Sequence, residues 1–170
     1  MLVAACGFEH GRLPEGTGGG GGTDIDANGV TNTDARKLDA PGAAPACWTA
    51  SGYSAAPSGR KYRAPHSDAT WTGAQSQCAS TGGHLVVIND GAENAHVQSI
   101  MDQNSWIGLS DHAQEGTFAW ANGEALSFTS WAPSEPQNSS GATCLYIMPD
   151  GKWAAGSCGS MEYVCECPYP

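Results

Sequence analysis

The stretch that decides the fold reads Trp106-Ile107-Gly108-Leu109 and continues, after six residues, as Gly116-Thr117-Phe118-Ala119-Trp120. An apolar run with one internal glycine is typical of a buried strand that another backbone approaches closely. The second run is followed by Asn122-Gly123, a dipeptide that favours a turn. We therefore expect two strands in this stretch, the first of them buried.

Toward the C-terminus, the sequence predicts a hairpin and a last strand. Residues 144–148 and 152–155 are apolar and alternating, and they flank the turn sequence Pro149-Asp150-Gly151. The final strand is expected over Tyr163–Cys167.

Toward the N-terminus, the pattern changes to helices. Trp71, Ala74 and Cys78 recur at helical spacing, with Asp68 as the expected N-cap and Gly82-Gly83 as the end. A short strand is expected over residues 60–63, and a buried strand over His84–Ile88. A second helix then begins at Asn89 or Asp90; its apolar side is formed by Ala92, Ala95, Val97, Ile100 and Met101. Two helices followed by strands and long loops indicate an α+β domain.

Length and charge restrict the possible functions. The 170 residues fit one domain and some additional chain. Seventeen acidic residues against seven Lys and Arg give a net charge of −10, which disfavours binding to nucleic acid or to an anionic membrane. Residues 1–45 are rich in glycine and lack tryptophan, so we expect a flexible acidic tether there and the folded domain over residues 46–170.

The first residues, Met1 to Gly7, resemble a bacterial lipobox, in which a cysteine receives lipid. By this resemblance Cys6 would anchor a secreted or surface protein in a bacterial envelope. Only five residues precede Cys6, and an apolar signal segment is missing from them. The alternative is an incidental free cysteine.

Six of the seven cysteines lie in the folded region. Their spacing does not match a zinc site, so three disulfides formed in an oxidising compartment are the better interpretation. Spacing alone leaves all 15 pairings of six cysteines open.

The order and spacing of these landmarks resemble a C-type lectin-like domain over residues 46–170. The landmarks are Trp71 to Cys78, Gly82 to Leu85, Glu93-Asn94, Trp106 to Leu109, Glu115 to Trp120, Ser130-Trp131, Glu135-Pro136-Gln137, Cys144, Trp153, Cys158 and Tyr163 to Glu166. The resemblance implies two helices, small antiparallel sheets, a long loop region and stapling by disulfides.

The resemblance also implies the disulfide pairing. In the family, the cysteines that correspond to Cys78 and Cys165 pair, and so do those that correspond to Cys144 and Cys158. Because the family's first and last strands pair with each other, a third bridge between Cys47 and Cys167 is reasonable, although it departs from the family's usual extra N-terminal bridge.

Members of the family bind sugar through a calcium ion, which takes about 6–8 oxygen ligands. By resemblance, Glu135 and Gln137 occupy two ligand positions, and Pro136 between them is expected to be cis. Alanines stand at the three other side-chain positions: Ala142, Ala154 and Ala155. A tight calcium site of the family type is therefore not expected.

A second, auxiliary calcium site in some members corresponds to positions that include Asp111, Glu115 and Asn138. These three side chains could bind calcium weakly. The alternative is that Asp111 and Glu115 order the loop by accepting hydrogen bonds from backbone N–H groups.

We therefore expect a secreted or cell-surface binding module for a carbohydrate or a protein, with Trp131, Glu135, Gln137 and Asn138 as ligand-binding candidates. Trp131 is either a stacking platform for a sugar or a core residue. The alternatives are a structural envelope domain without a small ligand, and weak calcium-dependent sugar binding. An enzyme is not expected, because the sequence has no recognisable Ser, His and acid arrangement, and nothing pairs Asp111, Glu115 and Glu135 about a scissile bond.

Overall fold

The computed structural model describes residues 44–137, 141 and 143–168. Cys6, Asn138 and Ala142 lie outside the described residues, and so does nearly all of the expected tether. Within these limits the chain forms an α+β fold with two helices and two small sheets, as the sequence predicts.

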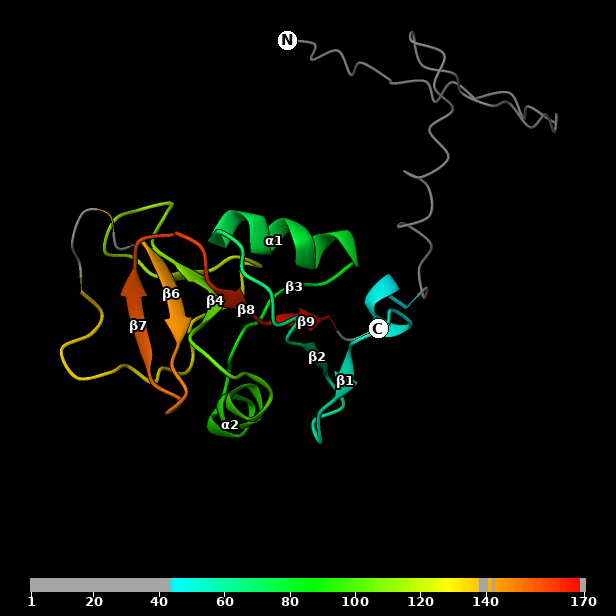
Figure 1. The fold of residues 1–170 in the computed structure, drawn as a ribbon. Coiled ribbons are helices and arrows are strands. Elements are labelled where there is room, and N and C mark those ends of the chain that lie inside the picture. The colour runs from blue at the N-terminus through cyan, green and yellow to red at the C-terminus, as the bar shows by residue number, and fades with distance from the viewer. Residues whose placement is uncertain (1–43, 138–140, 142, 169–170) are drawn as a thin grey trace, which may run out of the picture. The chain divides into compact units, whose positions relative to one another are not determined.

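The first sheet joins the two ends of the folded region. All its pairs are antiparallel, and its order is β1 (Ser54–Ala55), β2 (Lys61–Arg63), β9 (Cys165–Cys167) and β3 (His84–Leu85). The last strand therefore lies between two strands from the N-terminal half of the domain (Figure 1).

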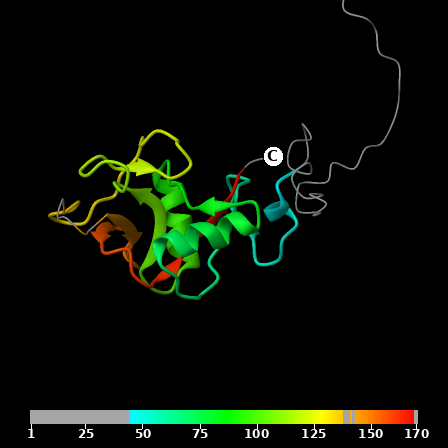
Figure 2. The ribbon, with the colours of Figure 1, turned by 90° about the horizontal axis from the view of Figure 1, so that it is seen from above.

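The second sheet carries the long loops. Its order is β5 (Ala119–Trp120), β4 (Ser105–Ser110), β6 (Cys144–Ile147) and β7 (Trp153–Gly156), with β8 (Glu162–Tyr163) pairing in parallel with β4. The predicted hairpin is formed by β6 and β7 about the turn at 149–151. Figure 2 shows the loops between β4 and β6 at one end of the domain and the cyan segment at residues 46–48 at the other.

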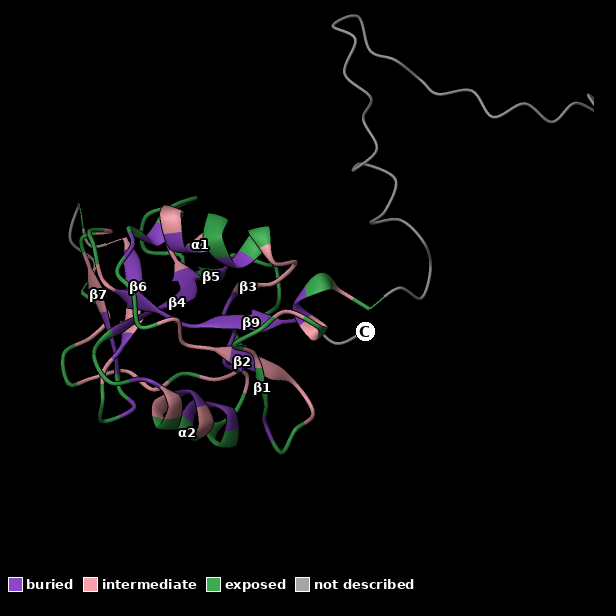
Figure 3. Cartoon of the chain, turned by 45° about the vertical axis from the view of Figure 1, so that its right-hand side comes forward, coloured by how far each residue is buried: buried purple, intermediate pink, exposed green. Residues whose placement is uncertain are grey.

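The helices α1 (Trp71–Ser80) and α2 (Gly91–Ile100) lie on opposite sides of the strands. A one-turn 3₁₀ helix, η1 (Ala46–Trp48), precedes β1. Figure 3 shows buried strands between the helices and exposed outer faces on both. None of the described helices is long and apolar enough to cross a bilayer.

The start of α1 differs from the expected one. The hydroxyl of Thr70, not the carboxylate of Asp68, accepts a hydrogen bond from the backbone N–H of Gly73 at 3.1 Å. Thr70 stands immediately before the first helical residue, which is where an N-cap must lie to reach the third N–H. The predicted cap of α2 is confirmed, because Asp90 accepts from the N–H of Glu93 at 2.8 Å.

The expected strand at 84–88 is shorter than predicted. Only His84 and Leu85 pair in a ladder; Val86, Val87 and Ile88 are fully buried as an irregular segment. Gly108 explains part of this geometry, since a Cβ there would lie 2.8 Å from the carbonyl oxygen of Leu85. The close backbone approach predicted at Gly108 is therefore confirmed. The strand expected at 116–120 likewise contains only Ala119 and Trp120.

The three expected disulfides are present: Cys47–Cys167, Cys78–Cys165 and Cys144–Cys158. The first ties η1 to the end of β9, and the second ties α1 to the start of β9. The third closes the base of the β6–β7 region next to the long loops.

Candidate functional site

The candidate site is the loop over residues 128–137, which is attached to strand β7. The backbone N–H of Trp153 donates to the carbonyl of Ser130 at 2.8 Å, and that of Ala132 donates to the carbonyl of Trp153 at 2.9 Å. Trp131 thereby forms an isolated parallel bridge with Trp153. The middle of the loop is thus held as an additional short edge of the second sheet.

An aromatic cluster fixes the same loop from beneath. The fully buried ring of Trp153 has three aromatic neighbours, with centroids 5.7–5.8 Å away: Trp120, Phe128 and Trp131. Trp131 also packs against Phe118 at 5.6 Å and stays half-buried. Its ring therefore contributes to packing and keeps one part exposed at the site.

Asn94, which sequence reasoning noted only as a landmark, positions the hairpin from α2. Its amide nitrogen donates to the carbonyl of Gly151 at 3.0 Å, and its amide oxygen accepts from the indole N–H of Trp153 at 2.8 Å. Asn94 is buried, and a buried amide needs hydrogen-bond partners within the protein; these two contacts supply one for each polar end. The signal that could have identified it is a polar residue within the inward-facing side of an amphipathic helix.

Glu135 lies at the centre of the candidate site. The peptide bond between Glu135 and Pro136 is cis, as expected. One carboxylate oxygen, Oε2, accepts hydrogen bonds from the backbone N–H of Gln137 at 2.9 Å and from that of Ala155 at 3.0 Å. A single side chain thereby connects the loop to β7, while the side chain of Gln137 is exposed.

Few side-chain oxygens stand at the described positions that the family resemblance assigned to calcium ligands. One oxygen of Glu135 is already used by two N–H groups, and Ala154 and Ala155 offer no side-chain oxygen. No group of three or more His, Cys, Asp or Glu side chains within the described residues is arranged to hold a metal. The third alanine position, 142, lies outside the described residues.

Asp111 follows β4 and is only 1% exposed. Its Oδ2 accepts from the backbone N–H of Gly116 at 2.9 Å, and its own N–H donates to the carbonyl of Thr143 at 3.2 Å. The other oxygen, Oδ1, is buried and has no hydrogen-bond partner among the described atoms. Asp111 thus orders the loop, and it also leaves an acceptor that is costly to bury unpaired. Glu115 is exposed.

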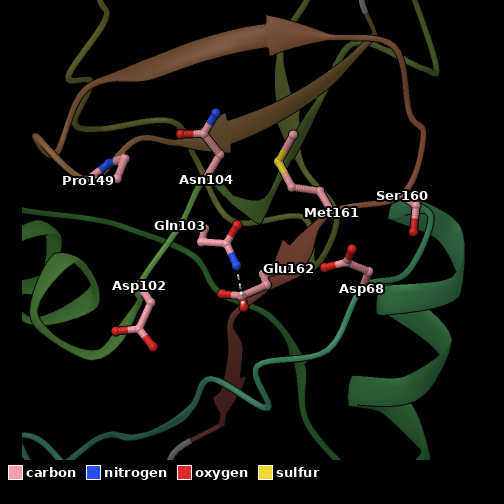
Figure 4. A pocket seen from close by; sticks show the side chains of 8 residues that line it. All are labelled: Asp68, Asp102, Gln103, Asn104, Pro149, Ser160, Met161 and Glu162. Carbon is pink, nitrogen blue, oxygen red and sulfur yellow. Dashed lines mark hydrogen bonds between the residues drawn. The ribbon is translucent and has the colours of Figure 1, made fainter.

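A separate hollow of about 460 Å³ lies at the opposite end of β4 from the loops (Figure 4). It is lined by Asp68, Asp102, Gln103, Asn104, Pro149, Ser160, Met161 and Glu162. Gln103 donates to the carboxylate of Glu162 at 3.2 Å. None of the site residues expected from the sequence lines this hollow, and its residues come from four separate segments, so no local motif indicates it.

Comparisons with known proteins agree with this architecture. Residues 67–167 match the family model described as the lectin C-type domain. The chain is 38% identical over 110 residues to pulmonary surfactant-associated protein D of Bos taurus. This match covers 62% of this chain and 30% of that protein. It is 35% identical over 100 residues to the low affinity immunoglobulin epsilon Fc receptor of Mus musculus. This second match covers 56% of this chain and 30% of that protein.

Among solved structures, the chain resembles the cow C-type carbohydrate-recognition domain of CD23, crystallised in the presence of a GlcNAc2Man3 oligosaccharide. The TM-score is 0.66 at 27% identity, and the match covers 71% of this chain and 96% of that one. The two curated relatives are matched over only 30% of their length, so the comparison concerns one domain of each.

Proposed function

The chain belongs to the C-type lectin domain family, and from that premise we propose that it is a non-catalytic binding module whose ligand loop is held by Glu135 instead of by calcium. The module presents residues 128–137 and the end of β7 to a protein or a carbohydrate. Membership of the family alone specifies neither how the loop is held nor which ligand it binds.

The observation that carries the proposal is the position of Glu135 Oε2 between two backbone N–H groups. In a calcium site this carboxylate would be a ligand, and the ion would need about 6–8 oxygens. The alanines at 154 and 155 supply none from their side chains. The carboxylate instead connects loop and strand directly, and hydrogen bonds to a charged acceptor are among the stronger ones.

Two features support the ligand classes. Ala155, which is half-buried, leaves a small apolar, uncharged area beside Glu135, and this area suits contact with a protein better than contact with a sugar diol. The half-buried ring of Trp131 could stack on a sugar without any metal. Among the relatives, one is named as an Fc receptor, and one structure was determined in the presence of an oligosaccharide.

The experiment is a screen of the full chain against glycan arrays and extracellular protein libraries, in calcium and again in chelator. We expect binding that persists in chelator and weakens at least several-fold in Gln137→Ala protein with an unchanged unfolding transition. Trp131→Ala should weaken binding as well, in protein that circular dichroism shows to be folded at the assay temperature, although the loss of packing against Phe118 and Trp153 should lower its stability. Binding that appears only with calcium would contradict the proposal. The absence of any ligand in either screen would favour the alternative, a structural envelope domain.

A second candidate function is weak calcium-dependent sugar binding, which the unpaired Oδ1 of Asp111 favours. Asp111, with exposed Glu115 and with Asn138 outside the described residues, could bind the ion weakly. Calorimetric titration with calcium tests this. Heat that disappears in Asp111→Asn protein would support an auxiliary ion, and the absence of heat in the unmodified protein would assign Asp111 to loop ordering alone.

We also propose a secreted or cell-surface location, in keeping with the three disulfides. The lipid anchor at Cys6 stays a prediction from the sequence. The relatives named above are animal proteins, so they give no support to a bacterial lipoprotein. Mass spectrometry of Cys6 in the protein isolated from its source would test the anchor.

A further inference from the structure

A second hollow, of about 410 Å³, lies between the β1–β2 turn and the start of α2. Its lining residues come from segments 56–62 and 89–96, and none belongs to the ligand loop at 128–137. Its volume is in the range of pockets that bind small molecules, which is roughly 300–1,000 Å³. The hollow is therefore large enough for a ligand of its own.

The walls of this pocket are mostly apolar. Ala56 and Pro57 contribute from the turn, and Ala92 and Ala95 contribute from the exposed side of α2. The rings of Tyr62 and His96, with centroids 5.0 Å apart, line it as well. Small side chains on the helix leave open a space that larger ones would fill.

Polar groups that satisfy one another are fixed beside these walls. The hydroxyl of Tyr62 donates to the carboxylate of Glu93, whose other oxygen accepts from the N–H of Asn89 at 2.7 Å. The guanidinium of Arg60 donates to Glu166 and lies 3.6 Å from Glu93. Because these partners hold one another, the pocket is preformed and needs little reorganisation to accept a ligand.

The charge around the pocket is unbalanced. Among the lining residues, the carboxylates of Asp90 and Glu93 stand against one guanidinium, that of Arg60, which is also paired with Glu166 behind the lining. Burial raises the pKa of Tyr62, so its phenol stays neutral at physiological pH. Asp90 is exposed at the rim, and only its Oδ1 accepts a hydrogen bond from the described part of the chain. Its second oxygen is available to a positively charged group.

We propose that this pocket binds a small amphiphilic cation, with its apolar body between the β1–β2 turn and α2 and its ammonium group at Asp90. The apolar walls and the excess negative charge select this class over neutral and anionic molecules of the same size. The site is independent of the ligand loop, so the proposal can fail or succeed separately from the proposed function.

The test uses three probes that share a phenyl ring and a short chain: phenethylammonium, 2-phenylethanol and phenylacetate. Binding to the full chain is followed by NMR at one fixed pH for all three probes. We expect shifts confined to segments 56–62 and 89–96. The ammonium should bind about fivefold more tightly than the alcohol, and the carboxylate most weakly.

Two variants and a control make the test specific. Ala92→Trp fills the pocket and should abolish binding, whereas Ser99→Trp puts the same ring on an exposed part of α2 that does not line it. Asp90→Asn keeps a good N-cap and should weaken the ammonium about threefold without changing the alcohol. Equal or tighter binding of the carboxylate, no binding of any probe, or unchanged binding in folded Ala92→Trp protein would overturn the proposal.

Discussion

At the scale of single residues, one carboxylate oxygen of Glu135 connects the loop over residues 128–137 to strand β7. The position of Glu135 and the cis bond to Pro136 follow the family resemblance. Its Oε2 accepts hydrogen bonds from the N–H groups of Gln137 and Ala155. The expectation that the alanines weaken a calcium site rests on the sequence and stays a prediction. Sequence reasoning could not foresee the partners, since Ala155 is 20 residues away along the chain.

Replacing Glu135 should therefore loosen the loop. We expect Glu135→Ala to lower the free energy of unfolding by about 1–3 kcal/mol, because two backbone donors lose a charged acceptor. Glu135→Gln keeps one carbonyl oxygen for them and should cost less. Urea titrations of both variants measure the difference. Equal stability of the alanine variant and the unmodified protein would show that the two hydrogen bonds contribute nothing to stability.

Glu166, which belongs to strand β9 and is only 1% exposed, gives a pH prediction. Burial raises its pKa above the usual 4.5, although hydrogen bonds from Val87 and Arg60 oppose the shift. Between the unfolded and the folded pKa, the folded protein binds more protons than the unfolded chain. The contribution of Glu166 to the free energy of unfolding therefore falls as pH rises through this window.

Glu166→Gln protein should lack that part of the slope. Unfolding free energies at a series of pH values, starting near the usual pKa of 4.5 and rising toward neutrality, measure it for both proteins. Parallel curves for the two proteins would contradict the assignment to Glu166.

At the scale of elements, the single strand expected over Tyr163–Cys167 is divided into β8, in the second sheet, and β9, in the first. The sequence predicts both helices and the β6–β7 hairpin well. Each of these carries its own local signals: helical spacing of apolar residues, a Pro-Asp-Gly turn or an alternating run. The segments at 86–88 and 116–118 are less well predicted. Val86, Val87 and Ile88 are β-branched, which favours a strand. The backbone hydrogen bonds of Val86 and Val87 nevertheless go to Val164, Gly108 and the side chain of Glu166, outside a regular ladder. Local sequence patterns do not indicate hydrogen-bond partners that are this far away along the chain.

The N-cap of α1 is Thr70 in the structure, whereas the sequence predicts Asp68, and two variants distinguish these assignments. Thr70→Ala should lower the free energy of unfolding by about 1 kcal/mol, because the N–H of Gly73 loses its acceptor. Asp68→Ala, which removes the cap expected from the sequence, should change it by less than about 0.5 kcal/mol. Thermal unfolding of the two variants measures both effects. A larger loss in the Asp68 variant would place the cap at Asp68 after all.

At the scale of the whole molecule, disulfides hold together a domain with short strands and long loops. The three bridges close stretches of 120, 87 and 14 residues. Each native bridge in a small secreted domain is worth about 2–5 kcal/mol, against a typical total stability of about 5–15 kcal/mol. The family resemblance implied two of these pairings and made the third reasonable, whereas spacing alone left all pairings open.

Reduction should therefore abolish the fold. We expect the near-ultraviolet circular dichroism of the packed tryptophans around Trp153 to disappear when the protein is incubated with a strong reductant. Alkylation with iodoacetamide before reduction serves as the control for incidental thiol reactions. A native spectrum after complete reduction, verified by mass, would mean that packing alone maintains the domain.

The central claim, that Glu135 holds the ligand loop without calcium, is tested most directly by amide hydrogen exchange at Gln137 and Ala155. We predict that both amides exchange slowly in chelator, that added calcium leaves their rates unchanged, and that Glu135→Ala accelerates both. Rapid exchange in chelator that calcium slows would contradict the account, because the loop would then depend on the ion.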